Sequence, residues 1–97
     1  MIREIAALTI APETTVAFEA AMAKARPIFL AAKGCHAMRL DRVIETPGQY
    51  RLVVEWDSLA HHTEIFRNAP GFQEWRALAG PFFVAPPVVV HTETVVG

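Results

Sequence analysis

Three short segments of the chain, at 5–8, 52–54 and 88–90, are apolar at consecutive positions instead of alternate ones. A β-strand with one face in water alternates apolar and polar residues, so this pattern predicts strands that are covered on both faces. The helical segments identified below suffice to cover one face of a sheet. We therefore expect a second copy of the chain to pack against the other face, as a homodimer.

The composition agrees with a small domain that keeps apolar surface for a partner. The chain has 97 residues, which predicts a single domain over 1–97, and 53% of them are apolar against about 45–50% in an average soluble domain. The formal net charge of −1 gives no basic footprint for nucleic acid or anionic lipid. The single cysteine excludes an intrachain disulfide and a cysteine-rich zinc site.

No segment reaches the roughly 20 apolar residues that a membrane span requires. The longest apolar run, 81–90, is interrupted by Pro86 and Pro87, and Arg3 and Glu4 lie within the first apolar stretch, which argues against a signal peptide. These features predict a cytoplasmic protein without a membrane segment.

The first half of the chain contains a strand followed by a helix. Residues 2–10 are rich in β-branched and apolar types without helical spacing and predict a strand. Pro12 then suits a first helical turn. One helix face is predicted by the three- and four-residue spacing of Phe18, Ala21, Met22, Ala25 and Phe29. Pro27 lacks an N–H, so we expect it to kink or end that helix.

The second half contains three more strands and two short helices. We expect strands at 35–44, 50–56 and 86–96 and helices at 59–67 and 72–79. The sequence at 46–49 is a turn signal, with glycine where a positive φ is wanted, although the register of this hairpin is left open. The order β-α-β-β-α-α-β predicts an α+β, ferredoxin-like fold with a four-stranded antiparallel sheet.

The histidines are the first candidates for chemistry, since imidazole titrates near neutral pH. His61 and His62 are adjacent on a helix and point about 100° apart, so they do not chelate one metal together. His61 and Glu64 share a helix face, but two ligands do not make a site, and we expect no bound metal. His36 and His91 lie on strands, where a half-buried, hydrogen-bonded imidazole is expected.

No nucleotide-binding, serine-hydrolase or zinc-protease motif is present. Cys35 fits a small buried hydrophobe better than a reactive thiol. Aromatic residues gather in the second half of the chain, at Tyr50, Trp56, Phe66, Phe72, Trp75, Phe82 and Phe83. They either fill the core or line a flat cavity for an aromatic ligand. Arg76 is a candidate anion contact if it points inward and a solvated helix charge if it points outward.

The segment YRLVVEWDS at 50–58, with Phe66 and the PGF of 70–72, resembles the antibiotic biosynthesis monooxygenase family. The resemblance covers nearly the whole chain in element order. It implies a dimeric α/β barrel formed by two ferredoxin-like sheets. It also implies oxygenation of a small aromatic or quinol-type substrate by O₂ without a cofactor.

The resemblance extends to particular residues. Trp56 matches the pocket tryptophan of the polyketide-oxidising members, and Arg76 matches an arginine on their last helix. Leu52 and His62 stand where those members carry asparagine and tyrosine. The predicted substrate pocket comprises Tyr50, Leu52, Phe66, Phe72 and Trp75. Haem degradation is not expected, because strand one has no asparagine and the other two positions of that triad correspond to Ile65 and Arg76.

On the oxygenase interpretation, His62 is the candidate base, since an imidazole suits proton abstraction at neutral pH. Arg76 would stabilise the anion, and Trp56 would pack against the substrate ring. Two alternatives stay open. One is a catalytically silent dimeric protein that binds an apolar metabolite. The other is a housekeeping domain that acts on reactive quinones or aldehydes.

Overall fold

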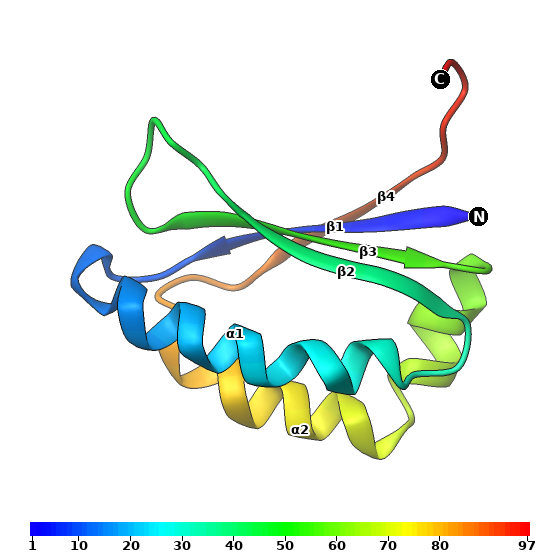
Figure 1. Ribbon diagram of the computed structural model, residues 1–97, viewed down its shortest axis with the longest axis horizontal. Helices are drawn as coiled ribbons and strands as arrows, with labels where there is room; N and C mark the ends of the chain where they lie inside the picture. Colours follow the sequence, from blue (N-terminus) through cyan, green and yellow to red (C-terminus); the bar gives the residue numbers. More distant parts are fainter.

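A computed structural model describes all residues 1–97. Its strands are β1 (Ile2–Thr9), β2 (Cys35–Arg42), β3 (Gln49–Trp56) and β4 (Val88–Thr92), and its longer helices are α1 (Thr15–Leu30) and α2 (Pro70–Ala79). Short helical segments are η1 (Pro12–Thr14), η2 (His61–Phe66) and η3 (Gly80–Phe82). The sheet is antiparallel in the order β2-β3-β1-β4, with both long helices on one face (Figure 1). The predicted α+β, ferredoxin-like fold is confirmed.

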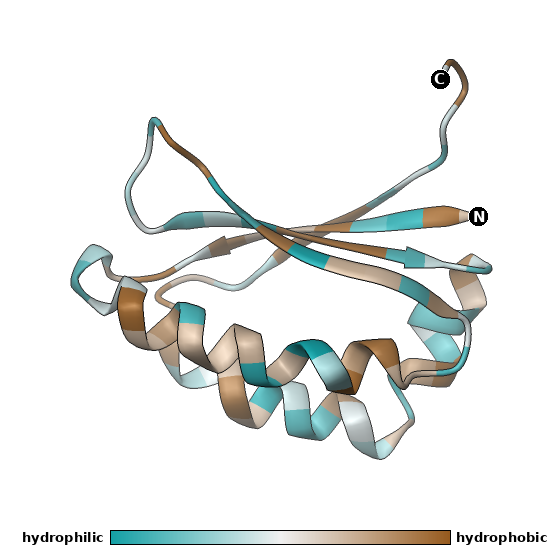
Figure 2. Ribbon diagram, in the orientation of Figure 1, coloured by the Kyte–Doolittle hydropathy of each residue, from teal (hydrophilic) through white to brown (hydrophobic).

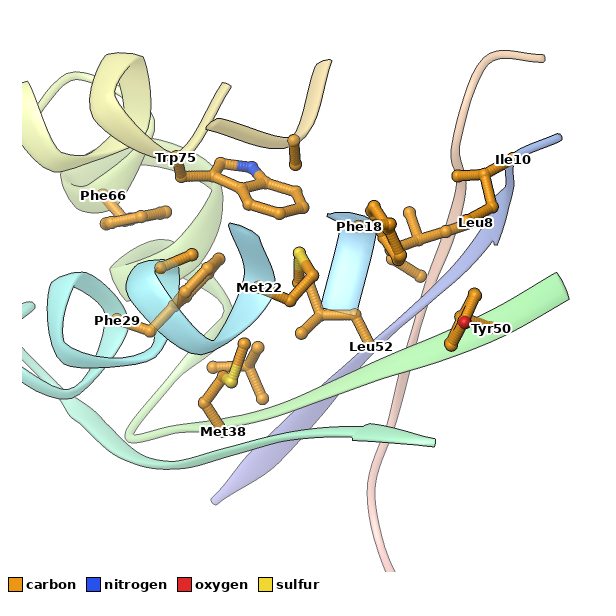
Figure 3. Packing of buried hydrophobic residues seen from close by; sticks show 14 of the residues in the cluster. Leu8, Ile10, Phe18, Met22, Phe29, Met38, Tyr50, Leu52, Phe66 and Trp75 are labelled. Atoms are coloured by element: carbon orange, nitrogen blue, oxygen red, sulfur yellow. The ribbon is translucent and has the colours of Figure 1, made fainter. Parts of the chain in front are cut away.

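The core lies between the sheet and the two long helices (Figure 3). Alternate residues of β3, namely Tyr50, Leu52, Val54 and Trp56, are at most 1% exposed, because a strand directs every second side chain to the same face. The predicted face of α1 meets them, with Phe18 and Phe29 fully enclosed. Neither helix is long and apolar enough to cross a membrane.

The sequence predicts that α1 kinks or ends at Pro27. The helix passes through Pro27 and ends at Leu30, so it does not end at the proline. The proline removes one backbone hydrogen bond, but the turn that follows it is held by packing. The ring centroid of Phe29 lies 5.1 Å from that of Phe66 and 5.3 Å from that of Trp75. Burial of such a ring is worth about 1.5–3 kcal/mol, which offsets the lost bond.

Strands β2 and β4 are shorter than predicted because a strand extends only as far as its neighbour. β4 pairs only with β1, and the strand pairing ends with Arg3 opposite Thr92, so the residues after Thr92 lie outside the sheet. Pro86 and Pro87 precede the strand and have no N–H to donate. β2 stops at Arg42, and Ile44 stands in the connecting loop with 87% of its surface exposed.

The turn between β2 and β3 depends on Gly48. The N–H of Gln49 donates to the carbonyl of Thr46 (3.1 Å), and Gly48 between them has φ +87°, so the predicted turn is present. The Gly48 carbonyl accepts from the N–H of Ile10 (2.8 Å). A Cβ on Gly48 would stand 2.4 Å from the Ile10 carbonyl oxygen, so only glycine permits this approach.

The face of the sheet away from the helices carries an apolar group, which we call the open face: Ile5, Ala7, Val53, Val88 and Val90. The strand register places Ile5 opposite both Val53 and Val90. Val88 and Val90 are 64% and 52% exposed. No helix covers this side of the sheet, and the strands contain both apolar and polar residues (Figure 2). The expectation that helices cover only one face is confirmed.

Candidate active site

A carboxylate lies on the inner face of the sheet. Glu4 is the second inward residue of β1, between Ile2 and Ala6, and only 5% of it is exposed. The register places it opposite His91 of the edge strand β4 and opposite Val54 of β3. Because Glu4 shares its face with the core, its charge is removed from water, which is costly unless other groups compensate.

The second titratable side chain comes from η2, a turn of π-helix. The N–H of Arg67 donates to the carbonyl of His62, five residues earlier, at 3.3 Å. π-helical turns are rare and frequently occur at functional sites. His62 is 4% exposed and Phe66 is 2% exposed, so this turn directs both rings against the end of β3.

Trp56 joins these elements. Its ring stacks on His62, with centroids 5.5 Å apart and an interplanar angle of 18°. Its indole N–H donates to Oε1 of Glu4 at 3.1 Å. His62 Nε2 lies 3.3 Å from the same oxygen, and His62 Nδ1 lies 2.8 Å from Nε2 of His91. Glu4, His62 and His91 therefore form a continuous chain of polar atoms, which we call the Glu–His–His chain.

Burial shifts the protonation equilibria of this chain toward the neutral forms. Desolvation raises the pKa of Glu4 from 4.5 to about 7, although the Trp56 hydrogen bond and the charge of Arg67 act in the opposite direction. Desolvation lowers the pKa of His62 from 6.5 to about 4, assisted by His91 and Arg67. It also lowers the pKa of His91, with Arg67 contributing. At neutral pH both histidines are therefore neutral, and the pKa of Glu4 lies near neutrality instead of well below it.

A cavity of about 200 Å³ opens beside this chain, between the sheet and the helices. Its apolar wall carries aromatic rings from α1, η2, α2 and the segment after η3: Phe29, Phe66, Phe72, Trp75 and Phe83. Glu4, His62, Arg67 and Arg76 supply the polar part of the wall. An apolar cavity with a few convergent polar groups is the usual form of a small-molecule site.

The two arginines stand at the mouth of this cavity. Both are exposed, and the guanidinium carbon of Arg76 lies 5.8 Å from the centroid of the Phe72 ring. Arg76 is thus a solvated helix residue that also lines the cavity. A guanidinium in this position attracts an anion without being buried itself.

The residues predicted for the site fall into three groups. His62, Arg76, Phe66, Phe72 and Trp75 line the cavity. Trp56 is fully buried behind Glu4 and His62 and is not part of the cavity wall. Leu52 belongs to the core, and Tyr50 lies in the core with its hydroxyl donating to Glu19, beside a second hollow between α1 and β2.

The other candidates lie away from the cavity. His36 is exposed and paired with Asp57, so the expectation of a half-buried imidazole is wrong there. A register shift between Cys35 and Ala37 takes His36 out of the strand pairing. His61 bonds to Ser58 (2.8 Å). No group of three or more His, Cys, Asp or Glu side chains is arranged to hold a metal ion.

Glu4 and Arg67 are cavity residues that were not predicted from the sequence, and His91 was predicted only as a hydrogen-bonded strand residue. Glu4 had a signal. It alternates with Ile2, Ala6 and Leu8, so a strand over these residues places an acid on the buried face. His91 is half-buried and hydrogen-bonded, as expected, but its partner could only be found from the register of β4.

These features define a class of protein: a ferredoxin-like α+β domain whose ligand cavity lies between one antiparallel sheet and its helices. The chain belongs to the antibiotic biosynthesis monooxygenase family, whose model matches residues 1–78. The family named in the sequence analysis is confirmed.

Three relatives illustrate the range of similarity. An uncharacterized protein, YczJ of Bacillus subtilis (strain 168), is 39% identical, over 98% of this chain and 100% of its own length. A crystal structure from Bordetella bronchiseptica that carries the family's name is 45% identical, with a TM-score of 0.95, over 98% of this chain and 97% of its own. A structure from Caulobacter crescentus CB15 (21% identical, TM-score 0.82, coverage 97% and 89%) shares the fold.

Proposed function

We propose that the protein is a monooxygenase that oxidises a small phenolic or quinol-type substrate with O₂ and without a bound cofactor. The observation that carries the proposal is the cavity, in which an aromatic wall, a buried carboxylate and an arginine converge. The aromatic wall suits the faces of a planar ring. Membership of the antibiotic biosynthesis monooxygenase family supports the reaction class.

The size of the cavity limits the substrate. An apolar cavity of about 150 Å³ is known to admit benzene, and this cavity has about 200 Å³. One ring or two fused rings therefore fit better than the three rings of an anthrone. We propose a mono- or bicyclic quinol as the substrate class.

The reaction balances without an external reductant. A quinol loses two hydrogens and gains one oxygen atom, and the second oxygen atom of O₂ leaves as water with those two hydrogens. Deprotonation makes the substrate ring electron-rich. The substrate then supplies all four electrons that reduce O₂, two for the incorporated oxygen and two for the oxygen that leaves as water. The protein then has to exclude water, accept a proton and stabilise the phenolate.

The geometry suggests a role for each predicted residue. Arg76 at the mouth would stabilise the phenolate oxygen. Trp56 is buried and would hold Glu4 and His62 in place, while the rings of Phe72 and Trp75 would contact the substrate. The proton acceptor is Glu4 or His62, since both reach the cavity wall.

We further propose that the protein acts as a homodimer in which the open face of each sheet packs against the other copy. Exposed Val88 and Val90 support this arrangement, because apolar side chains on a sheet face gain free energy when they leave water. Two sheets in contact would form the dimeric barrel that the sequence resemblance implies.

Oxygen consumption tests the proposal. Chelator-treated protein is supplied with mono- and bicyclic quinols and with an anthrone, beside the variant Arg76→Gln. Arg39→Gln is the matched control, since Arg39 is exposed on β2 outside the cavity. We expect oxygen uptake with the smaller quinols, unchanged in the control and lowered about tenfold in kcat/KM for Arg76→Gln.

The alternative is a catalytically silent binding protein. It is favoured by the two ring nitrogens of His62, which both face partners within the protein, His91 and Glu4. Absence of oxygen uptake across the panel, together with saturable quenching of Trp75 fluorescence by the same phenols, would establish binding and overturn the oxygenase proposal.

A further inference from the structure

The two oxygens of Glu4 differ in their surroundings. Oε1 accepts the indole N–H of Trp56 and lies beside Nε2 of His62, whereas Oε2 has no hydrogen-bond partner in the protein. Every fully buried side-chain oxygen or nitrogen of the protein has a hydrogen-bond partner. Because Oε2 has none, it is not fully buried. Glu4 lines the cavity, so Oε2 is accessible from there.

We propose that Glu4, through Oε2, takes the proton from an acidic substrate in the cavity and that His62 and His91 carry it to the protein surface. The proposal rests on the proposed function for the identity of the substrate. The relay itself is a property of the protein without substrate. It assigns His62 as a relay instead of the base that contacts the substrate.

The chain has two complete proton arrangements, because a neutral imidazole carries one N–H and one lone pair. In the first, Glu4 is protonated at the oxygen facing His62 and donates to Nε2, while Nδ1–H of His62 donates to Nε2 of His91. In the second, Glu4 is ionised and accepts from Nε2–H of His62, while Nδ1 of His62 accepts from Nε2–H of His91. In both, the proton between His62 and His91 lies in a 2.8 Å hydrogen bond, and the proton between Glu4 and His62 lies in a 3.3 Å contact.

The two arrangements differ by one proton. The first holds three: one on Glu4, one on Nδ1 of His62 and one on Nδ1 of His91. The second holds two, on the Nε2 atoms of the two histidines. Uptake of a proton at Oε2, with a turn of the carboxyl group about its Cγ–Cδ bond and a change of tautomer in both rings, converts the second into the first. The return releases one proton from Nδ1 of His91.

The surroundings of the Glu–His–His chain favour proton exchange with solvent at His91. Glu4 and His62 are 5% and 4% exposed, whereas His91 is half-buried on the edge strand β4 and reaches solvent. The charged neighbour is Arg67, and Arg76 reaches the same cavity. Burial raises the pKa of the nearby Cys35 thiol, so it does not compete for the proton at neutral pH.

Nuclear magnetic resonance of the ligand-free protein tests the relay without any assay of activity. Ring ¹⁵N shifts of His62 and His91 are followed from pH 5 to pH 9 together with the ¹³C shift of the Glu4 carboxyl. We expect the protonated nitrogen of His62 to change from Nδ1 to Nε2 as Glu4 ionises. Glu4→Gln is the control, because an amide cannot ionise, and it should hold His62 in one tautomer. A single His62 tautomer throughout the Glu4 titration of the unmodified protein overturns the relay.

Turnover provides a second test, with His91→Gln as the variant. Glutamine keeps a hydrogen bond to His62 but cannot pass a proton. We expect several-fold slower turnover that added imidazole restores in proportion to its concentration, an effect that loss of structure would not show. Slower turnover without restoration overturns the exit through His91. If no quinol is oxidised at all, the oxygenase proposal fails while the tautomer measurement still decides the relay.

Discussion

The indole N–H of Trp56 donates to Oε1 of Glu4 across the buried face of the sheet, at 3.1 Å. The two residues lie on neighbouring strands, β1 and β3, and Trp56 is opposite Ile2, two positions along β1 from Glu4. This bond holds one carboxylate oxygen in place and leaves the other to the cavity. Trp56, which matches the pocket tryptophan of the family, thus orients Glu4, a residue that the family resemblance did not indicate.

Replacement of Trp56 by phenylalanine removes this donor. The hydrogen bond lowers the pKa of Glu4, so its loss should raise that pKa above about 7. The smaller ring and the lost bond should lower the free energy of unfolding by about 1–3 kcal/mol. Carboxyl ¹³C titration and urea unfolding measure the two effects. Trp75→Phe is the control, since the Trp75 indole makes no hydrogen bond to Glu4, and it should leave the pKa of Glu4 in place.

Glu4 and His62 have opposite effects on the pH dependence of stability. Glu4 has a pKa of about 7 in the folded protein and 4.5 as its ordinary value, so its contribution to stability is lost as the pH rises from 4.5 to 7. His62 has values of about 4 and 6.5, so its contribution is lost as the pH falls from 6.5 to 4. Between pH 4.5 and 6.5 these two effects on the free energy of unfolding have opposite signs and cancel in the unmodified protein.

Single variants should reveal each slope. Relative to the unmodified protein, Glu4→Gln should lose stability as the pH falls through this range, because only the His62 contribution remains. His62→Gln should lose stability as the pH rises, by up to about 1.4 kcal/mol per pH unit. Urea unfolding at half-unit pH steps measures both, with His61→Gln as the control. If the stability of both variants changed with pH in the same direction, the opposite pKa shifts of Glu4 and His62 would be contradicted.

A Gly48→Ala substitution should destabilise the fold by about 1–3 kcal/mol. Its φ of +87° is strained for alanine, and the new Cβ would stand 2.4 Å from the Ile10 carbonyl oxygen. Gly80→Ala is the matched control, because Gly80 has φ −53° and nothing within 4 Å of an added Cβ. It should leave stability unchanged or raise it by about 0.4–1 kcal/mol. Thermal unfolding of both variants makes the comparison, and equal losses would contradict the account of this turn.

The proposed dimer predicts a specific effect of charge on the open face. Val90→Asp places a carboxylate among Ile5 and its neighbours and should shift the protein to monomers, measured by sedimentation velocity. Val16→Asp is the control, since Val16 is 85% exposed on α1, away from the sheet face, and should not change the oligomeric state. A monomeric unmodified protein would contradict the dimer.

Several features of this protein follow from the sequence alone because they depend on short-range physics. The alternation of Tyr50, Leu52, Val54 and Trp56 predicts a strand and its buried face, and the structure confirms both. The glycine in the turn at 46–49 is required by local backbone geometry. The family resemblance likewise rests on short stretches of sequence, 50–58 with Phe66 and 70–72.

Tertiary structure decided the rest. Whether Pro27 ends a helix depended on the packing of Phe29, and the length of β4 depended on where β1 begins. The Glu–His–His chain combines residues from β1, η2 and β4, which lie up to 87 positions apart in the sequence, as the numbers 4 and 91 show. A shift of β4 by one residue would turn His91 to the opposite face of the sheet. The sequence contains all three side chains, but only the register and the π-helical turn bring them into contact.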